Sequence, residues 1–147
     1  EHLDYCSVLD DARNAFVMGC LLQEVTRSGT AASAKRALGR TDIYGKTGTT
    51  NDSMDAWFAG WHPSLVAVVW IGYDTPRKLG DKETGGGLAL PVWMDYMAQA
   101  LKGVPVKELP PPEGLVQIGG EWYFEEYGPS AGVGSLGLAL WSAVRCG

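Results

Sequence analysis

The spacing of apolar residues near the start of the chain predicts one amphipathic helix. The apolar positions recur three or four residues apart, which places them on one helical face: Ala15, Met18, Leu22 and Val25. Acidic residues at 10–11 are favoured at the positive N-terminal end of a helix, and Gly29 is typical of a C-terminal stop. We expect this helix to be part of the scaffold.

The middle of the chain alternates between β-rich runs and turn signals. Residues 41–50 are mostly small, residues 56–61 are apolar and aromatic, and the sequence His-Pro-Ser at 62–64 marks a turn. Residues 65–73 are apolar at almost every position, which is typical of a strand covered on both faces. Because the connection between the last two runs is short, we expect a unit of three antiparallel strands.

A glycine-rich stretch then precedes a second helix. Residues 75–90 predict a loop, and the glycines at 85–87 do not indicate a phosphate site, because no strand leads directly into them and no Lys-Ser or Lys-Thr pair follows. Pro91 is favoured in the first turn of a helix. An apolar stripe follows it: Val92, Trp93, Tyr96, Met97 and Ala100. We expect a core-packing helix that ends near Gly103.

Prolines mark the boundary of this domain. Residues 104–112 contain four prolines and predict a stiff, extended linker. The expected regions are a first domain over 1–104, a linker over 105–114 and a small C-terminal extension over 115–147. Within the extension, residues 116–118 and 121–127 flank a Gly-Gly pair, which predicts a tight hairpin.

Composition argues for an ordinary globular protein with no nucleic-acid partner. The 147 residues are 46% hydrophobic and 20% charged, which excludes general disorder. The net charge is -5, and the basic runs are too short for a phosphate-binding stripe. No signal peptide is visible, and the longest apolar stretches are too short to cross a bilayer comfortably.

The cysteines and histidines indicate no metal centre or cofactor. Cys6, Cys20 and Cys146 lie far apart and form no C-x-x-C pair. Cys20 falls in an apolar helical stretch, where a cysteine usually acts as a small buried hydrophobic residue. His62 precedes a proline in a turn, where a surface histidine is the simpler interpretation. We therefore expect no metal and no cofactor.

The chemistry concentrates in the run of small residues at 46–50. Lys46 supplies a fixed positive charge, and the hydroxyls of Thr47 and Thr49 can bind a carboxylate. Gly48 lets another backbone approach closely, and the Thr49 N–H can serve as half of an oxyanion hole. A peptide can add to the edge of such a strand, so the run fits a site that binds a peptide with a free C-terminal carboxylate and attacks its last amide.

We assign Lys46 and Thr49 as catalytic candidates. The substrate-binding candidates are Thr47, Gly48, Thr49 and Thr50. The alternative is an ordinary strand with a solvated lysine and two surface threonines. The Lys-Thr-Gly tripeptide alone favours that alternative, because three common residues match by chance in many proteins.

The wider sequence resembles the transpeptidase domain of the class A (bifunctional) penicillin-binding proteins. The most typical runs are Lys-Thr-Gly-Thr-Thr-Asn-Asp at 46–52 and Asp-Ala-Trp-Phe at 55–58. The similar stretches span residues 13–115, most of the chain: 29–31, 37–52, 55–60, 69–74, 85–93 and 111–115. The last of these, with the segment to Leu138, resembles the C-terminal extension of the 1A subset.

The resemblance implies a serine acyltransferase that acts on peptidoglycan stem peptides. A serine in an S-x-x-K motif attacks the penultimate D-Ala carbonyl, and β-lactams mimic the D-Ala-D-Ala end. The resemblance implies that Lys46 sets the electrostatics of proton transfer, that Thr47 and Thr49 bind the carboxylate, and that the Thr49 N–H completes the oxyanion hole. It also implies an α+β, serine β-lactamase/transpeptidase-like fold, with a five-stranded antiparallel sheet between helices, of which three strands are present here.

The chain departs from this pattern at its nucleophile. No S-x-x-K and no S-x-N motif occurs in the 147 residues. We expect both motifs upstream of Glu1, together with a glycosyltransferase domain and a membrane anchor, at the periplasmic face of the bacterial inner membrane. Alone, the chain should be inactive, and it should need the upstream segment, an oligomer or a swapped strand, because apolar side chains are left exposed. The expected exposed residues are Trp57, Phe58, Trp61 and Trp70.

Two other functions stay open from the sequence. A serine β-lactamase shares the fold and the Lys-Thr-Gly strand, although the Thr-Thr-Asn-Asp run and the proline-linked extension favour a transpeptidase. A non-catalytic binding or interaction module would explain the missing nucleophile. The intact Lys-Thr-Gly strand argues against a decayed site.

Overall fold

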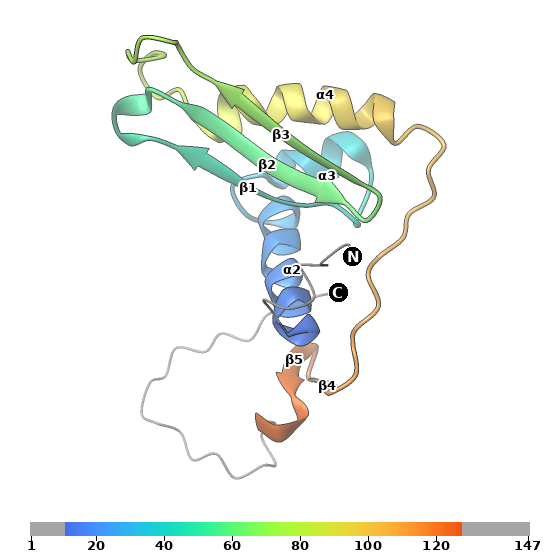
Figure 1. Ribbon diagram of the computed structural model, residues 1–147. Helices are drawn as coiled ribbons and strands as arrows, with labels where there is room; N and C mark the ends of the chain where they lie inside the picture. Colours follow the sequence, from blue (N-terminus) through green and yellow to red (C-terminus); the bar gives the residue numbers. More distant parts are fainter. Residues whose placement is uncertain (1–10, 128–147) are drawn as a thin grey trace, which may run out of the picture. The chain divides into compact units, whose positions relative to one another are not determined.

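The computed structural model describes residues 11–127, which form two compact units (Figure 1). Residues 22–108 make one unit, and residues 11–21 together with 109–127 belong to the other. The helices are α2 (Ala12–Arg27), α3 (Ala32–Leu38) and α4 (Leu90–Ala100). The strands are β1 (Tyr44–Thr49), β2 (Ala56–His62), β3 (Leu65–Ile71), β4 (Leu115–Ile118) and β5 (Glu121–Phe124). Short helical turns are η1 (Asn51–Ser53), η2 (Gly85–Ala89) and η3 (Glu125–Tyr127).

Three antiparallel strands in the order β1-β2-β3 form the sheet of the first unit. Strand β1 pairs with β2 from Tyr44 opposite Trp61 to Thr49 opposite Ala56, without a bulge. Among the described residues, β1 has β2 as its sole strand neighbour and is therefore an edge strand. The predicted α+β fold with three antiparallel strands is confirmed. Strand β1 begins three residues later than expected, at Tyr44.

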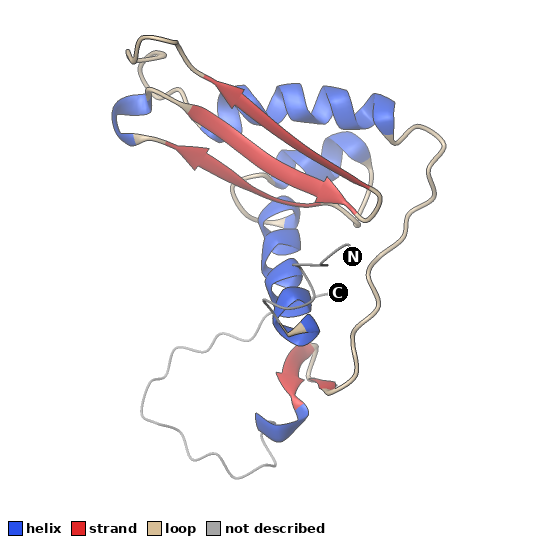
Figure 2. Cartoon of the chain, viewed as in Figure 1, coloured by secondary structure: helices blue, strands red, loops and turns tan. Residues whose placement is uncertain are grey.

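One face of the sheet packs on α4, which lies behind the strands in Figure 2. Phe58 of β2 is fully buried and meets the Trp93 ring edge-on, with centroids 4.9 Å apart. The Trp93 indole N–H donates to the Ala67 carbonyl of β3 at 2.9 Å. This satisfied donor lets a large aromatic side chain fill the core without leaving a polar atom unpaired.

The opposite face of the sheet is open. Along β3 the side chains alternate between partly buried and exposed, so the expectation of a strand covered on both faces is wrong for the described residues. Val66 is 71% exposed, Trp57 is 42% exposed and Trp70 is 45% exposed. The predicted exposure of Trp57 and Trp70 is confirmed. That of Phe58 is wrong, because its side chain lies on the α4 face, where it is fully buried. Trp61 is half-buried and not exposed, with its ring stacked on Tyr44 at 5.4 Å.

Helix α2 buries a different face from the one that the apolar spacing predicts. Met18 is exposed, whereas Cys20, Gln23 and Thr26 are buried. The two polar side chains are buried because each donates a hydrogen bond to a backbone carbonyl just before β1. Cys20 is buried as expected, but it is disulfide-bonded and is not a free thiol.

Helix α4 begins at Leu90, with Pro91 in its first turn as predicted. Its buried positions are Leu90, Trp93 and Met97, followed by Leu101 just past its end. Val92 and Tyr96 belong to the predicted apolar stripe but are exposed, since the covered side of the helix is narrower than the stripe. The turn η2 occupies the end of the expected loop and continues directly into α4.

The second unit contains the predicted hairpin. Strands β4 and β5 pair around Gly119 and Gly120, whose φ angles of 64° and 89° require glycine or a similarly permissive residue. The Arg13 guanidinium pairs with Glu126 at 2.7 Å and lies over the Phe124 ring at 4.8 Å. These contacts join the start of α2 to the hairpin within this unit. The boundaries of the three expected regions remain a prediction, and the tail after Tyr127 lies outside the described residues.

Candidate functional site

Strand β1 carries the predicted site residues Lys46, Thr47, Gly48 and Thr49 at the edge of the sheet. Because side chains alternate along a strand, Lys46 belongs to the open face and Thr47 and Thr49 to the face of Phe58. The Lys46 Nζ nevertheless lies 2.8 Å from the Thr47 carbonyl oxygen and 3.5 Å from the Thr47 hydroxyl. The ammonium and the hydroxyl therefore converge beside the strand, as a shared anion-binding site requires.

The cation of this site is not neutralised by a neighbouring acid. Lys46 is exposed, and among residues 11–127 no carboxylate lies within ion-pair distance of it. An uncompensated positive charge next to hydroxyl donors favours a negatively charged group. Within the same residues, no cluster of His, Cys, Asp and Glu has the composition to hold a metal ion.

Thr47 is joined by a second threonine that the sequence analysis did not place in the site. The Thr30 and Thr47 hydroxyl oxygens lie 3.0 Å apart, with Thr30 in the connection between α2 and α3. One hydroxyl donates to the other, so one proton of the pair stays free for a ligand. Thr30 falls within a stretch that resembles the family, at 29–31, and that stretch is the signal that would have pointed to it.

Thr49 is held by the turn that precedes α4. Its hydroxyl oxygen accepts a hydrogen bond from the Gly85 N–H at 3.0 Å. Because the oxygen serves as the acceptor of this bond, its own proton is free to be donated to another group. The backbone of η2 thus prepares the Thr49 hydroxyl as a donor, which matches the carboxylate-binding role expected for this residue.

Gly85 is a position where only glycine fits. A Cβ there would lie 2.3 Å from the Trp57 carbonyl oxygen and 2.4 Å from the Gly48 carbonyl oxygen, both in paired strands. The glycine therefore allows η2 to touch the backbone of β1 and β2 directly. The pattern of this glycine run predicts a plain loop and carries no sign of its contact with the site.

Thr50, the fourth substrate-binding candidate, lies at the end of β1 in the connection to β2. Its hydroxyl accepts a hydrogen bond from the Asp55 N–H at 2.8 Å, and its own N–H donates to the Asp55 carbonyl at 3.1 Å. The Asp55 carboxylate in turn accepts the Trp70 indole N–H at 2.9 Å. These bonds close the connection and fix the end of the strand.

The start of β1 is fixed in a similar way. Gln23 donates to the Thr41 carbonyl at 2.7 Å and Thr26 donates to the Ile43 carbonyl at 2.7 Å, both from α2. Between these two, Asp42 is fully buried and pairs with Arg40 at 2.8 Å. The wall formed by residues 46–49 is thus held at both of its ends by side-chain hydrogen bonds.

Comparison with known proteins finds close relatives of one kind. The chain is 53% identical over 116 residues to penicillin-binding protein 1A of Neisseria gonorrhoeae, a match that covers 79% of this chain and 14% of that protein. It is 49% identical over 108 residues to penicillin-binding protein 1A of Pseudomonas aeruginosa, covering 74% and 13% respectively. The chain thus spans about one seventh of the length of these relatives. No family model matches it.

A solved structure supports the same relationship. The crystal structure of penicillin-binding protein 1A from Haemophilus influenzae superposes with a TM-score of 0.67 at 36% sequence identity, over 71% of this chain and 17% of that one. Identity and fold therefore agree on the same kind of relative. Within residues 11–127, no helix has the length and apolar character needed to span a membrane.

Proposed function

Because the chain belongs to the penicillin-binding protein 1A family, we propose that it supplies the substrate-binding wall of a D,D-transpeptidase that cross-links peptidoglycan. The observation that carries this proposal is the Thr49 hydroxyl, which accepts the Gly85 N–H and so keeps its proton for a ligand. Lys46 on the same strand brings its ammonium to 3.5 Å from the Thr47 hydroxyl, and this positive charge beside hydroxyl donors suits a carboxylate. The free C-terminus of a D-Ala-D-Ala stem peptide, or the carboxylate of a β-lactam, provides that group.

The proposal gives each site residue a role. Thr47 and Thr49 donate hydrogen bonds to the carboxylate, and Lys46 supplies positive charge for it and for proton transfer at the nucleophile. The peptide adds alongside β1, where Gly48 leaves room for it, and the Thr49 N–H stabilises the oxyanion. Thr50 fixes the end of the strand through Asp55 and so keeps the wall in register.

The nucleophile in this proposal comes from a separate segment that carries the S-x-x-K and S-x-N motifs. The open sheet face, with Trp57, Val66 and Trp70 exposed, is the surface on which that segment would pack. Burial of these side chains would stabilise the pair by the hydrophobic effect. The whole protein would act at the periplasmic face of the inner membrane.

Two alternatives differ in their chemistry. A serine β-lactamase would use the same wall but release its acyl group rapidly to water. The relatives from Neisseria gonorrhoeae and Pseudomonas aeruginosa are penicillin-binding proteins, and this favours the transpeptidase. A non-catalytic module would bind no acyl group at all.

Fluorescent penicillin tests the proposal directly. The chain is incubated with the reagent alone and together with a segment that carries S-x-x-K, and covalent labelling is read from a denaturing gel. We expect no label on the chain alone, and a stable serine acyl-enzyme in the pair that is lost with Lys46→Ala. Lys78→Ala is the matched control, because Lys78 is an exposed lysine that lies outside β1.

Each other outcome counts against a stated part of the proposal. Labelling of the isolated chain would show that the nucleophile is not supplied from elsewhere. Hydrolysis of the acyl-enzyme within seconds would favour the β-lactamase. A pair that forms but never labels would favour the non-catalytic module.

A further inference from the structure

Buried polar side chains converge on the three residues that lead into β1. The buried polar or charged residues among 11–127 are Gln23, Thr26, Asp42 and His62, so the expectation of a surface histidine at 62 is wrong. Gln23 bonds to the carbonyl of residue 41, Thr26 to the carbonyl of residue 43, and His62 to the side chain of Asp42. All four therefore act on one short segment, although such groups are costly to bury anywhere in a core.

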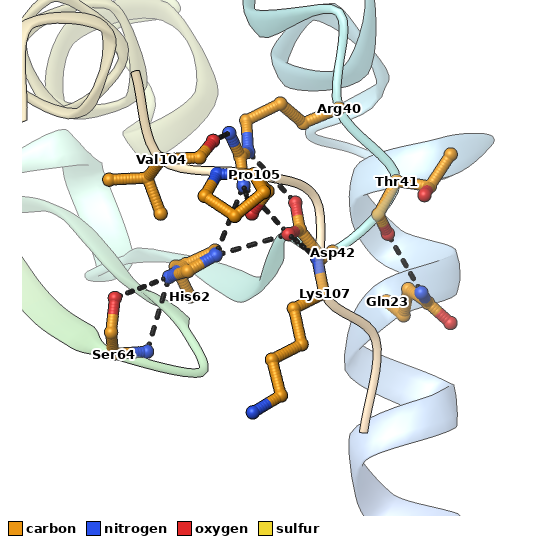
Figure 3. Close-up of polar contacts among 9 residues, drawn as sticks. All are labelled: Gln23, Arg40, Thr41, Asp42, His62, Ser64, Val104, Pro105 and Lys107. Atoms are coloured by element: carbon orange, nitrogen blue, oxygen red, sulfur yellow. Dashed lines mark hydrogen bonds and ion pairs between the residues drawn. The ribbon is translucent and has the colours of Figure 1, made fainter. Parts of the chain in front are cut away.

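The Asp42 carboxylate is the centre of this network (Figure 3). Arg40 donates two parallel hydrogen bonds to it, from Nε to Oδ1 at 2.9 Å and from Nη2 to Oδ2 at 2.8 Å. The Lys107 N–H donates to Oδ2 at 2.7 Å, and Arg40 also donates to the carbonyls of Val104 and Pro105 at 2.6 and 3.0 Å. The network thus ties residues 104–107 to the start of β1.

The hydrogen bonds also assign the tautomer of His62. The Ser64 N–H donates to Nδ1 at 3.1 Å, so Nδ1 is the acceptor and the ring proton lies on Nε2. Nε2 then donates to Asp42 Oδ2 at 3.0 Å. Arg40 Nη2 also lies 3.1 Å from Nε2, but its two protons are directed to Asp42 and Pro105, so Nε2 is not needed as their acceptor. His62 therefore ties the end of β2 to the start of β1.

Burial acts to raise the pKa of Asp42, but the hydrogen bonds and charge of Arg40 and the hydrogen bond from the Lys107 N–H outweigh it. The pKa of this carboxyl lies below its ordinary value of 3.8 as a result. Asp42 is therefore ionised at neutral pH, and its negative charge is fully hydrogen-bonded. A satisfied buried network of this kind favours one arrangement of the chain over its alternatives.

The open edge of β1 explains why such a network is needed. Strand β1 has β2 on one side and no strand on the other within the described residues, so its position depends on β2 and on its two ends. Apolar side chains in place of Gln23, Thr26 and Asp42 would bury equally well, but they would not fix the direction in which the strand leaves α2 and α3. Directional bonds from Gln23, Thr26 and Arg40 fix it.

We propose that Thr26, Arg40 and Asp42 are positioning residues, which fix the start of β1 and thereby place the wall at 46–49 for its ligand. The inference rests on the proposed function in treating that strand as a substrate wall. The anchoring itself stands on the hydrogen bonds alone. Residues 104–107 take part, so the segment that leaves the domain is coupled to the position of the wall.

The same residues do not form a serine nucleophile. Asp42, His62 and Ser64 are hydrogen-bonded in the order of a charge-relay triad, with Ser64 Oγ 2.8 Å from His62 Nδ1. However, Nδ1 already accepts the Ser64 N–H, and the Asp42 charge is paired with Arg40. The imidazole therefore has neither a free acceptor nor an unpaired carboxylate behind it, both of which a general base needs.

Amide hydrogen exchange of the full chain tests the inference. The variants are Thr26→Val, which keeps the volume and removes the hydroxyl, and Asp42→Asn, which removes the charge. We expect the amides of β1 to exchange about tenfold faster or more, while those of α4 change by less than about threefold. Thr26→Ser restores the hydroxyl and should restore protection. Thr75→Val is the matched control at an exposed loop position.

The outcomes separate this inference from the proposed function. Equal increases in the exchange rates of β1 and α4 would show a loss of global stability and overturn the positioning role. Unchanged exchange rates in β1 in both variants would overturn it as well. Labelling of Ser64 by a fluorophosphonate would also overturn it. In the reconstituted pair, Thr26→Val should slow penicillin acylation while the pair still forms. If the unaltered pair never labels, the proposed function fails and the exchange result still stands.

Discussion

Replacing Gly85 by alanine should disconnect the turn η2 from strand β1. The added Cβ would lie 2.3 Å from the Trp57 carbonyl oxygen and 2.4 Å from the Gly48 carbonyl oxygen. Both oxygens belong to paired strands and cannot move separately. The turn must therefore move away from the sheet by about 1 Å to restore an ordinary contact. The Gly85 N–H then loses its 3.0 Å bond to the Thr49 hydroxyl.

The structure gives the size of this effect. Overpacking of a rigid site costs about 1–3 kcal/mol, and the lost hydrogen bond adds about 1 kcal/mol. We therefore expect Gly85→Ala to lower the free energy of unfolding by about 2–4 kcal/mol, a large part of the stability of a small domain. Equilibrium urea denaturation, followed by tryptophan fluorescence, measures this change.

Gly87→Ala is the matched control for this experiment. A Cβ at Gly87 meets only the Thr84 hydroxyl, at an ordinary distance of 3.5 Å, so its effect on stability should stay within about 1 kcal/mol. In the reconstituted pair, Gly85→Ala should also weaken penicillin acylation, because Thr49 is no longer oriented. A Gly85→Ala chain within about 0.5 kcal/mol of the wild type would refute the reasoning.

Three further predictions address the anchoring of β1, its hydroxyl and the open face. The pKa of Asp42 is lowered in the folded state, so its contribution to stability is present above its ordinary pKa of 3.8 and is lost as the pH falls through the lower folded value. Urea denaturation from about pH 3 to about pH 7 measures the free energy of unfolding, which should change less with pH in Asp42→Asn than in the wild type. Near neutral pH the variant should be less stable by about 3 kcal/mol. The same pH dependence in both proteins would contradict this. Thr49→Val leaves the buried Gly85 N–H without its acceptor and should cost about 1–3 kcal/mol, measured by thermal denaturation, whereas Thr49→Ser should cost clearly less. Acrylamide quenching of Trp57 and Trp70 should fall when the segment carrying S-x-x-K is added, and quenching that stays the same would place that segment elsewhere.

The sequence predicts the strands well and the packing of the helices poorly. Strand β2 and strand β3 begin at the expected residues because continuous apolar and aromatic runs between turn signals leave few alternatives. The exposed side of β3 was not predictable from those runs, since the sequence does not say what covers a strand. In helix α2 the sequence instead fails to predict which residues are buried. Its buried residues Gln23 and Thr26 are polar, and their partners at 41 and 43 are distant in sequence.

For the site, the sequence identifies the strand but not the residues from other elements that contact and orient its side chains. The Lys-Thr-Gly run and its neighbours predict where Lys46 and Thr49 lie. The contacts that orient them come from Thr30 and Gly85, which reach the strand only through the tertiary fold. A small side chain or a glycine carries little pattern of its own, so such supports are visible only in three dimensions.

The Thr49 hydroxyl bears on inhibitor chemistry. Since the Gly85 N–H already donates to this oxygen, the hydroxyl presents its proton outward. A compound that places an acceptor there, such as a carboxylate, a sulfonate or a tetrazolate, meets a complementary partner. A primary amide whose NH₂ faces the hydroxyl cannot accept its proton. An ester can accept the proton but carries no charge, so it is not attracted by the Lys46 ammonium. If the proposed function holds, inhibitors directed at this strand should keep an anionic acceptor at that position and seek selectivity elsewhere on the scaffold.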